Sequence, residues 1–433
     1  MQRTQMPPMG WNSWDCYGKY PTEKNILNNL NVMKQKLKPF GYTYLVIDAG
    51  WNIEKDSANN LSGVSIDAFG RYIPFKKDFP HGLKYIADKA HNAGLLFGIH
   101  IMRGIPREAY DKNLPVYGTT YHARDIADTT SLCKWNHDNY GIDMNKPGAQ
   151  EYYNSYINLL ASWGVDYIKA DDITAHPQEI NAVEKAIDKT GRKIVLSLSP
   201  GGDSKTEFID DYKTATLLRI TGDVWDNEKS INKVFDAWKN WNAYANEGLW
   251  LDMDMIPFGH ICINNHVNDY LQTDSSEGNK GSKGKERMCA FTKNEKYTFI
   301  TQRALGASPL FMGGDLSTTD TFSFQLLTNK EMLACNKNGV TGRLVYSDDN
   351  LEIWKTVNKT DSSKGWIGIF NRSNNDNKTS FTLQQLQLSP CGLFDIWNAG
   401  SLGKISNAIN VTVPQKGVLF YKYDETVKQN SIL

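Results

Sequence analysis

The sequence predicts an α/β protein in which a (β/α)8 TIM barrel is followed by a C-terminal antiparallel β-sandwich domain. Up to about residue 335, short apolar segments alternate with amphipathic helical segments, and eight such β-α units follow one another. From about residue 343, short apolar segments are separated by turns rich in Asn, Ser and Gly, as in antiparallel strands. We therefore expect a barrel at residues 1–338 and a β-sandwich at residues 339–433.

The first four units each pair an apolar strand with an amphipathic helix. "MGWNSWD" precedes a helix around residues 23–38, and "YTYLVIDAGW" precedes "HGLKYIADKAHNAG". "LLFGIHIMRG" is followed by an irregular insertion at 105–145 and then by "PGAQEYYNSYINLLASWG". "VDYIKADD" leads to a helix at 177–190. This alternation places parallel strands inside a layer of helices.

The last four units repeat the pattern. "KIVLSLSPGG" leads to a helix at 204–214, and "TLLRITGD" precedes "EKSINKVFDAWKNWNAYANEG". "LWLDMDMIP" precedes "KNEKYTFITQRALG", and "SPLFMGGDL" precedes the helix through "NKEMLACNKN". A doubly wound sheet is the alternative, but no Gly-rich phosphate-binding fingerprint follows the first strand. The barrel is therefore favoured.

The C-terminal region contains five apolar segments, "RLVYSDDNLEIWKTV", "GWIGIFNRS", "KTSFTLQQLQL", "LFDIWNAG" and "GVLFYKY". Their short length and polar turns predict the sandwich. Before them, the polar run "SSEGNKGSKGKER" at 275–287 predicts a mobile loop within the barrel domain rather than a linker.

Composition narrows the classes of partner. Lys+Arg and Asp+Glu both number 48, so the formal net charge is zero and nucleic acid is not expected as the main partner. No segment reaches the roughly 18 apolar residues of a membrane span, and the N-terminus shows no apolar core of a signal peptide. The sequence does not indicate an oligomeric state. It leaves the compartment open as well: the chain is cytoplasmic as it stands, or secreted or periplasmic if it is a trimmed mature form.

The cysteines give no sign of a metal centre. The six cysteines are scattered and show neither CxxC nor Cys/His metal-binding spacing, so we expect free thiols and no structural zinc. No cofactor is expected either. Twelve Trp and 21 Tyr are more than an average core needs, and some aromatic side chains could stack on sugars or bases.

Polar side chains follow nearly every predicted barrel strand. In this fold the active site is built at the carboxyl ends of the strands. Those ends carry Asp15, Asp48, His100, Asp171 with Asp172, Ser199, Arg219 with Asp223, Asp252 with Asp254, and Asp315. Helix capping alone would account for Asp15, Asp172 or Asp315, but it does not require Lys169 or Arg219 beside the acids.

Converging carboxylates with two cations suit few reactions. Hydrolysis at a metal centre usually needs several histidine ligands, and His100 is the one histidine at a strand end; a divalent metal held by oxygens alone has no motif here. Glycoside hydrolysis needs two carboxylates and benefits from an aromatic floor for the sugar ring. Trp11, Trp14, Trp51 and Trp225 lie close to the strand ends in sequence.

The motifs "MGWNSWD", "YLVIDAGW", "GLLFGIH", "WGVDYIKAD", "RITGD", "LDMDMI" and "SPLFMGGDL" together resemble those of the α-galactosidase / α-N-acetylgalactosaminidase family of retaining glycosidases, glycoside hydrolase family 27. They occur in order along nearly the whole predicted barrel. The resemblance implies a catalytic barrel, a C-terminal β-sandwich and an oligosaccharide or glycoconjugate substrate.

The resemblance also implies roles for single residues. Asp171 matches the nucleophile and Asp223 the general acid/base. Three further residues match sugar ligands: Lys169, which also helps to keep Asp171 ionised; Arg219, near carbon 2; and Asp48, which grips hydroxyls far from the scissile bond. Trp14 matches the aromatic residue on which the sugar ring packs.

The departures from the family pattern concern the sugar. Ala49 replaces a second acid, His100 replaces a tyrosine, and Ser199 with its neighbours replaces a glutamate that reads the 2-hydroxyl; Gly50 stands where the cysteine partner of Cys16 is usual. We therefore predict an α-galactosidase, with an α-N-acetylgalactosaminidase or a β-L-arabinopyranosidase as alternatives. A carbohydrate-binding protein that has lost turnover is a further alternative, which the complete set of Asp171, Asp223, Lys169 and Arg219 disfavours.

Overall fold

The computed structural model describes residues 4–202, 204–245, 248–263 and 284–426. Its N-terminal part is organised around an eight-stranded parallel sheet in the order β12-β11-β10-β9-β5-β2-β1-β15. The strands are β1 (Met9–Asn12), β2 (Tyr44–Ile47), β5 (Leu96–Met102), β9 (Tyr167–Asp171), β10 (Val195–Leu198), β11 (Leu217–Arg219), β12 (Trp250–Asp252) and β15 (Leu310–Met312). This sheet fits a (β/α)8 barrel, as the sequence predicts.

Helices alternate with these strands, and the longer ones begin at recognisable caps. They are α2 (Glu23–Lys36), α3 (Gly82–Asn92), α6 (Ala149–Ser162), α7 (Pro177–Lys189), α9 (Glu228–Trp241), α10 (Lys293–Leu305), α11 (Thr321–Leu327) and α12 (Lys330–Lys337). Thr22 caps α2, and Thr292 forms a capping box with Glu295 at the start of α10. The expected helix at 204–214 is shorter than predicted: a 3-10 turn (Thr206–Phe208) leads into the single turn α8 (Ile209–Tyr212).

The insertion at 105–145 is more regular than its sequence suggested. It contains β6 (Ile105–Pro106), α4 (Arg107–Asp111), α5 (Ala123–Ile126), β7 (Ala127–Leu132) and β8 (Asn139–Ile142), and the three strands form an antiparallel sheet in the order β6-β8-β7. A small hairpin of β3 (Ile53–Lys55) and β4 (Leu61–Val64) follows β2. Both additions belong to connections that leave the carboxyl ends of parallel strands.

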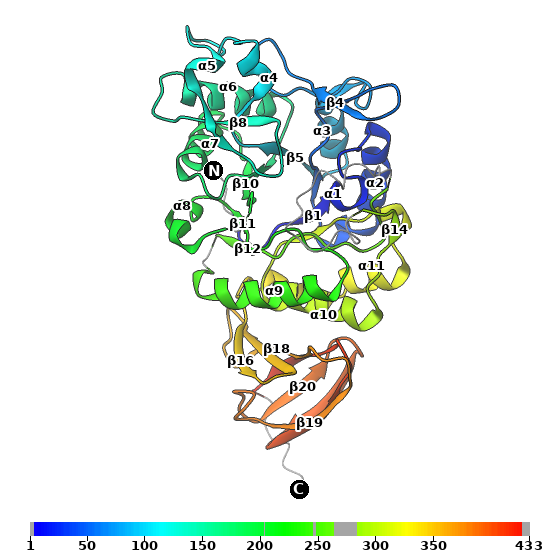
Figure 1. Cartoon of the computed structure of the whole chain (residues 1–433). Helices are drawn as coiled ribbons and strands as arrows, with labels where there is room; N and C mark the ends of the chain where they lie inside the picture. Colours follow the sequence, from blue (N-terminus) through cyan, green and yellow to red (C-terminus); the bar gives the residue numbers. More distant parts are fainter. Residues whose placement is uncertain (1–3, 203, 246–247, 264–283, 427–433) are drawn as a thin grey trace.

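The C-terminal part consists of antiparallel sheets (Figure 1). Six strands pair in the order β16-β17-β18-β23-β20-β21, and β19 pairs with β22. Their bounds are β16 (Arg343–Ser347), β17 (Leu351–Val357), β18 (Lys364–Asn371), β19 (Asn377–Thr382), β20 (Cys391–Asp395), β21 (Gly400–Ile405), β22 (Ala408–Val413) and β23 (Val418–Asp424). This part has its own buried apolar cluster, which includes Ile353, Ile369 and Tyr423.

The C-terminal sheets pack against α9 and α10 (Figure 1). The indole of Trp238 on α9 stacks on that of Trp354 on β17, with ring centroids 3.6 Å apart and 12° between the planes. Beside the stack, Lys239 on α9 donates to the buried carboxylate of Glu352 at 2.6 Å. Aromatic stacking and an ion pair thus join the two parts.

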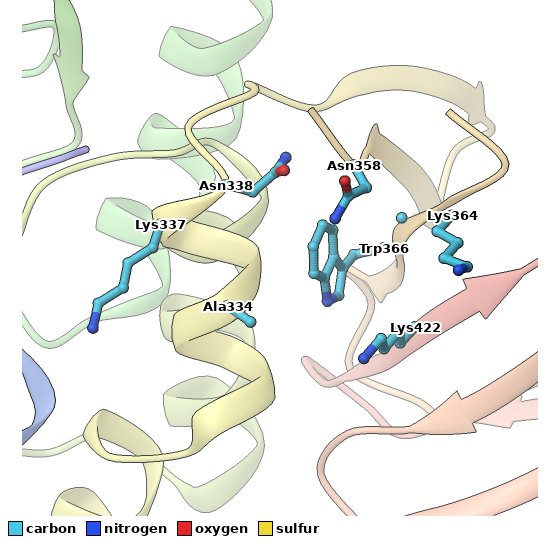
Figure 2. A pocket seen from close by; sticks show the side chains of 8 residues that line it. Ala334, Lys337, Asn338, Asn358, Lys364, Trp366 and Lys422 are labelled. Atoms are coloured by element: carbon cyan, nitrogen blue, oxygen red, sulfur yellow. The ribbon is translucent and has the colours of Figure 1, made fainter. Parts of the chain in front are cut away.

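A cavity of about 430 Å³ lies between α12 and the C-terminal sheet. Figure 2 shows Trp366 at its centre with Lys364 and Lys422 beside it, while Lys337 points away. The chain itself holds all three ammonium groups: Lys337 donates to the carbonyl of Phe40 at 2.7 Å, Lys422 pairs with Glu331 at 2.9 Å, and Lys364 pairs with Asp361 at 3.1 Å. The lysines of this cavity therefore serve contacts within the fold.

Of the predicted mobile loop at 275–287, residues 275–283 lie outside the described part of the chain. Beyond it, β14 (Arg287–Met288) pairs with β13 (His260–Ile261). No helix in the described part of the chain is long and apolar enough to cross a membrane.

Candidate active site

The parallel sheet brings the predicted strand-end residues to one edge. Asp48 directly follows β2, while His100 lies in β5 and Lys169 and Asp171 lie in β9. The register pairs His100 with Lys169 on the neighbouring strand. Arg219 ends β11 and pairs with Asp252 of β12. Because all eight strands run in the same direction, their polar carboxyl-terminal residues gather at the same end of the sheet.

Asp48 and Lys169 form a buried ion pair. The Lys169 ammonium donates to Oδ2 of Asp48 at 2.8 Å, and the Asn12 amide donates to the same oxygen at 2.7 Å. Burial by itself opposes ionisation of Asp48, but the nearby Lys169 and His100 outweigh it and hold the pKa of Asp48 well below its usual range. Asp48 is therefore a carboxylate at any physiological pH.

Asp171 is held as an anion by its surroundings. Its Oδ2 lies 3.2 Å from Nε2 of His100, and its Oδ1 accepts a hydrogen bond from the amide of Asp172 at 2.9 Å. Burial raises the pKa of this carboxyl, but His100, Arg219 and Lys169 lower it further than burial raises it, so the net pKa shift is downward. The structure thus contains a buried carboxylate that remains ionised, which is what an attacking carboxylate requires.

Arg219 connects this region to a second group of acids. Its Nη1 lies 3.1 Å from Oδ1 of Asp223 and 3.3 Å from Oδ1 of Asp254. Burial disfavours the guanidinium, but Asp254, Asp223 and Asp171 raise the pKa of Arg219 above its usual value. Asp254 also accepts from the amide of Val224 at 2.8 Å, which fixes the loop carrying Asp223.

Asp223 is more accessible than Asp171. Its side chain is 29 % exposed, whereas that of Asp171 is 10 % exposed. A group that exchanges protons with a leaving group and then with water needs such access. The carboxyl groups of Asp171 and Asp223 therefore differ in their access to solvent.

Two further acids near Arg219 hold protons more tightly than usual. Burial and the neighbouring Asp254 raise the pKa of Asp252 to about 6. Burial, followed by Asp254 and Asp223, raises the pKa of Asp15 well above its normal value. Oδ2 of Asp15 has no hydrogen-bond partner within the described part of the chain. This side of the site therefore contains two acids that resist ionisation.

Trp14 and Ser199 complete the set of predicted ligands. Trp14 begins the short helix α1 (Trp14–Tyr17) and packs, partly exposed, against an apolar cluster that includes Tyr44 and Phe311. Ser199 follows β10, donates its amide to the carbonyl of Ala170 at 2.8 Å, and is buried. Its hydroxyl lacks a hydrogen-bond partner among the described residues.

Asp315 serves the fold rather than this site. Its carboxylate caps the 3-10 turn Leu316–Thr318 through the amide of Ser317, and it accepts from the Tyr17 hydroxyl at 3.0 Å. Capping was the alternative interpretation of Asp315, and it is the one that the contacts support.

Sequence reasoning missed three features of the site. Asn12 shares Asp48 with Lys169, Asp254 shares Arg219 with Asp223, and Arg103 contacts the residue after Asp171. Asp254 stood at a predicted strand end, so its position was a usable signal. Asn12 and Arg103 gave no signal, because nothing in an isolated sequence shows which polar side chains face the same carboxylate.

No cluster of three or more His, Cys, Asp or Glu side chains suited to a metal ion occurs among the described residues. The six cysteines are free thiols, of which Cys289 is partly exposed and the others are buried. Three acids of the site have partners of opposite charge or an imidazole: Asp48 contacts Lys169, Asp171 contacts His100, and Asp223 contacts Arg219.

Comparison with known proteins identifies the family. A crystal structure of a family 27 β-L-arabinopyranosidase from Geobacillus stearothermophilus is 37% identical, with a TM-score of 0.89 over 99% of this chain and 98% of that one. The chain belongs to glycoside hydrolase family 27. The family model described as alpha galactosidase A matches residues 137–271. The resemblance drawn from the motifs is thereby confirmed.

Relatives of this chain differ in the sugar for which they are named. A putative α-N-acetylgalactosaminidase from Bacillus halodurans is 35% identical, with a TM-score of 0.84 over 96% of this chain and 97% of that one. Alpha-galactosidase 2 of Arabidopsis thaliana is 28% identical over 357 residues, which cover 80% of this chain and 71% of that protein. The chain is therefore a glycoside hydrolase, and the prediction of an enzyme is confirmed.

Proposed function

We propose that this family 27 glycosidase releases terminal α-D-galactosyl-type residues with retention of anomeric configuration. The environments of two acids carry the proposal: Asp171 is buried and held ionised, and Asp223, which contacts Arg219, is more accessible. Two carboxyl groups with different environments are what a double displacement needs.

In the first step, Asp171 attacks the anomeric carbon while Asp223 donates a proton to the departing glycosidic oxygen. This gives a covalent glycosyl-enzyme and a free aglycone. In the second step, Asp223 takes a proton from water, which attacks the anomeric carbon and releases Asp171. We expect the two carboxyl groups to lie about 5–5.5 Å apart in a sugar complex, since larger separations belong to inverting enzymes.

The surrounding residues bind the sugar in this proposal. Lys169 and Asp48 offer a donor and an acceptor side by side, which suits neighbouring hydroxyls. His100 holds Asp171 and faces the same hydroxyls, and Trp14 provides an apolar surface for the ring. Arg219 and Ser199 lie toward carbon 2, where Nε of Arg219 and Oγ of Ser199 lack partners among the described residues.

β-L-Arabinopyranosidase is the second candidate function. β-L-Arabinopyranosides are α-D-galactosides without the exocyclic hydroxymethyl group. Ala49 follows Asp48 where many family members have a second acid, so a contact for hydroxyls at that end of the sugar is absent from this position. The solved arabinopyranosidase is 37% identical to the chain, whereas the α-galactosidase of Arabidopsis thaliana described above is 28% identical.

A panel of three nitrophenyl glycosides tests the proposal. We expect hydrolysis of the α-D-galactoside or the β-L-arabinopyranoside, and NMR should show that the first product has the anomeric configuration of the substrate. The ratio of kcat/KM values decides between the two sugars. A clear preference for the α-N-acetylgalactosaminide would overturn both, and a first product of inverted configuration would overturn the double displacement.

We extend the proposal to the closure of the barrel and to the bounds of the two domains. A parallel bridge between Ile256 and Met312 links the segment after β12 to β15, the two edge strands of the eight-stranded sheet, and supports a closed barrel. The catalytic barrel would then occupy residues 1–338, and residues 339–433 would form a β-sandwich with its own apolar cluster.

A further inference from the structure

The second aspartate of "KADD" is the residue of this motif that the proposed chemistry leaves without a role. Asp172 is 8 % exposed and has a left-handed backbone conformation with φ of 57°. Residues other than glycine rarely adopt this conformation, and Asp and Asn tolerate it best. Its amide donates to Oδ1 of Asp171, so the backbone at Asp172 helps to define where that carboxylate lies.

Arg103, just after β5, grips this unusual peptide. Its Nε donates to the carbonyl of Asp172 at 2.8 Å and lies 2.9 Å from Oδ2 of the same residue. Its backbone amide donates to the carbonyl of Asp171 at 3.1 Å. Arg103 therefore contacts the carbonyl groups of the two peptide bonds that flank Asp172.

Arg103 is itself anchored from behind. Its Nη1 lies 2.9 Å from Oε1 of Glu179 on α7, and Glu179 accepts at 2.5 Å from the hydroxyl of Tyr153 on α6. The amide of Asn139 on β8 donates to the Arg103 carbonyl at 2.7 Å. The guanidinium is 2 % exposed, so these contacts fix a group that water does not reach.

Asp172 also reaches the next strand end. A Cβ on Gly201 would lie only 1.7 Å from Oδ1 of Asp172, so the carboxylate packs directly against the turn after β10. The amide of Ile173 donates to the carbonyl of Ser199 in the same turn, at 3.3 Å. The aspartate thus lies between the ends of β5, β9 and β10.

We propose that Asp172 and Arg103 are positioning residues that hold Asp171 in the orientation for attack on the anomeric carbon. This inference rests on the proposed function, because it takes Asp171 as the nucleophile. Burying a carboxylate and a guanidinium is costly unless they are paired, and together they hold a residue of unusual backbone conformation next to Asp171. A shift of about 1 Å in such a carboxylate lowers turnover by about 100-fold.

The test combines two variants in a cycle. Asp172→Asn keeps the size of the side chain and its tolerance of the left-handed conformation but removes the charge that faces Arg103. Asp171→Gly removes the nucleophile, and azide supplied in solution then acts in its place. Azide needs no carboxylate to be oriented. We expect Asp172→Asn to lower kcat/KM by about 10- to 100-fold in the native background and by less than about 3-fold in the azide-rescued Asp171→Gly background.

Asp166→Asn is the matched control. Asp166 immediately precedes β9, at the opposite end of the strand from Asp171, and pairs with Arg192 at 2.6 Å. The Asp166→Asn substitution removes an ion pair beside β9 but leaves the carboxyl end of that strand unchanged. We therefore expect kcat/KM to change by less than about 3-fold in either background. Asp172→Gly, which also accepts a positive φ, replaces Asp172→Asn if the latter does not fold.

The possible results distinguish a failure of the positioning role from a failure of Asp171 as the nucleophile. Equal losses from Asp172→Asn in both backgrounds overturn the positioning role, because general damage to the site would affect azide rescue as well. An unchanged kcat/KM in the native background overturns it too. If azide yields no inverted glycosyl azide with Asp171→Gly, the assignment of the nucleophile fails, and the positioning role fails with it.

Discussion

The two halves of the site differ in how their charges are balanced. The Asp171 half consists of Asp48, His100, Lys169 and Asp171, and the carboxylates in it contact a cation or an imidazole at 2.8 and 3.2 Å. The Asp223 half consists of Asp15, Arg219, Asp223, Asp252 and Asp254, in which the carboxylates of Asp223 and Asp254 contact the guanidinium of Arg219. The pKa values of Asp48 and Asp171 are therefore shifted downward in one half, whereas those of Asp15 and Asp252 are shifted upward in the other.

This difference assigns the chemistry better than residue identity does. Both halves present aspartates at strand ends, and an aspartate can serve as nucleophile or as acid. The pKa of Asp171 is shifted downward and that of Asp252 upward to about 6, although both are buried aspartates at strand ends. Burial raises the pKa of both acids, so the downward shift at Asp171 reflects His100, Arg219 and Lys169 around it.

The largest expected effect comes from removing the ionised acid. Asp171→Gly should lower kcat by about 10⁴-fold or more, because no other group can form the glycosyl-enzyme. Azide should restore turnover and give a glycosyl azide of inverted configuration, detected by NMR. An azide of retained configuration would instead assign Asp171 as the acid/base and reverse the two halves.

The second effect depends on the leaving group. Asp223→Ala removes proton donation, so kcat/KM should fall by about 10²–10⁴-fold for a substrate with a poor leaving group, such as an alkyl glycoside. A dinitrophenyl glycoside leaves without a proton, so its kcat/KM should fall much less. The slope of log(kcat/KM) against leaving-group pKa measures this difference, and an unchanged slope would remove Asp223 from the acid/base role.

The third effect concerns pH. In the ionised state, Asp171 is stabilised by His100, and burial opposes that ionisation. His100→Phe keeps the burial and removes the stabilising group, so the pKa of Asp171 should rise and the acidic limb of the kcat/KM profile should move to higher pH. His91→Phe is a suitable control, because His91 pairs with Asp166, which immediately precedes β9 at the end of the strand opposite Asp171. An acidic limb that stays in place would contradict the pairing of His100 with an ionised nucleophile.

The smallest effect is on stability. The folded-state pKa of Asp15 is raised above its unfolded value, so the folded protein binds this proton more tightly and loses stability as pH rises from about 4 through the folded pKa. Asp15→Asn removes that loss and should stabilise the fold by at least about 1 kcal/mol at neutral pH, with little change near pH 4. Thermal unfolding at both pH values measures the difference, and a neutral-pH loss of stability would show that Asp15 is ionised and needed there.

The outline of the fold could be predicted because its signals are local. Apolar strands such as Tyr44–Ile47 and capped helices such as Glu23–Lys36 can be recognised from a short window of sequence. The sheet inside the insertion could not, since Ile105–Pro106 and Asn139–Ile142 are short and pair across more than thirty residues of chain. Strand β22 was missed for a similar reason: its alternating pattern is short, and its partner β19 lies well before it in the chain.

The sequence predicted which residues form the site better than it predicted the contacts among them. Asp48, Lys169, Asp171, Arg219 and Asp223 follow strands that could be recognised, so their common edge followed from the parallel fold. The contact of His100 with Asp171, and that of Arg103 with Asp172, depend on side-chain directions across neighbouring strands. Those directions are set by packing in three dimensions, which one sequence does not reveal.

Trapping of the covalent intermediate tests the central contrast between the two halves most directly. A fluorinated galactosyl or arabinopyranosyl fluoride slows hydrolysis of the glycosyl-enzyme, so that the labelled protein can be digested and its peptides analysed by mass spectrometry. We expect one sugar per chain, attached to the peptide that contains Asp171 and located on that residue by fragmentation. A label on Asp223, or turnover of the fluoride to a product of inverted configuration without any label, would contradict the assignment.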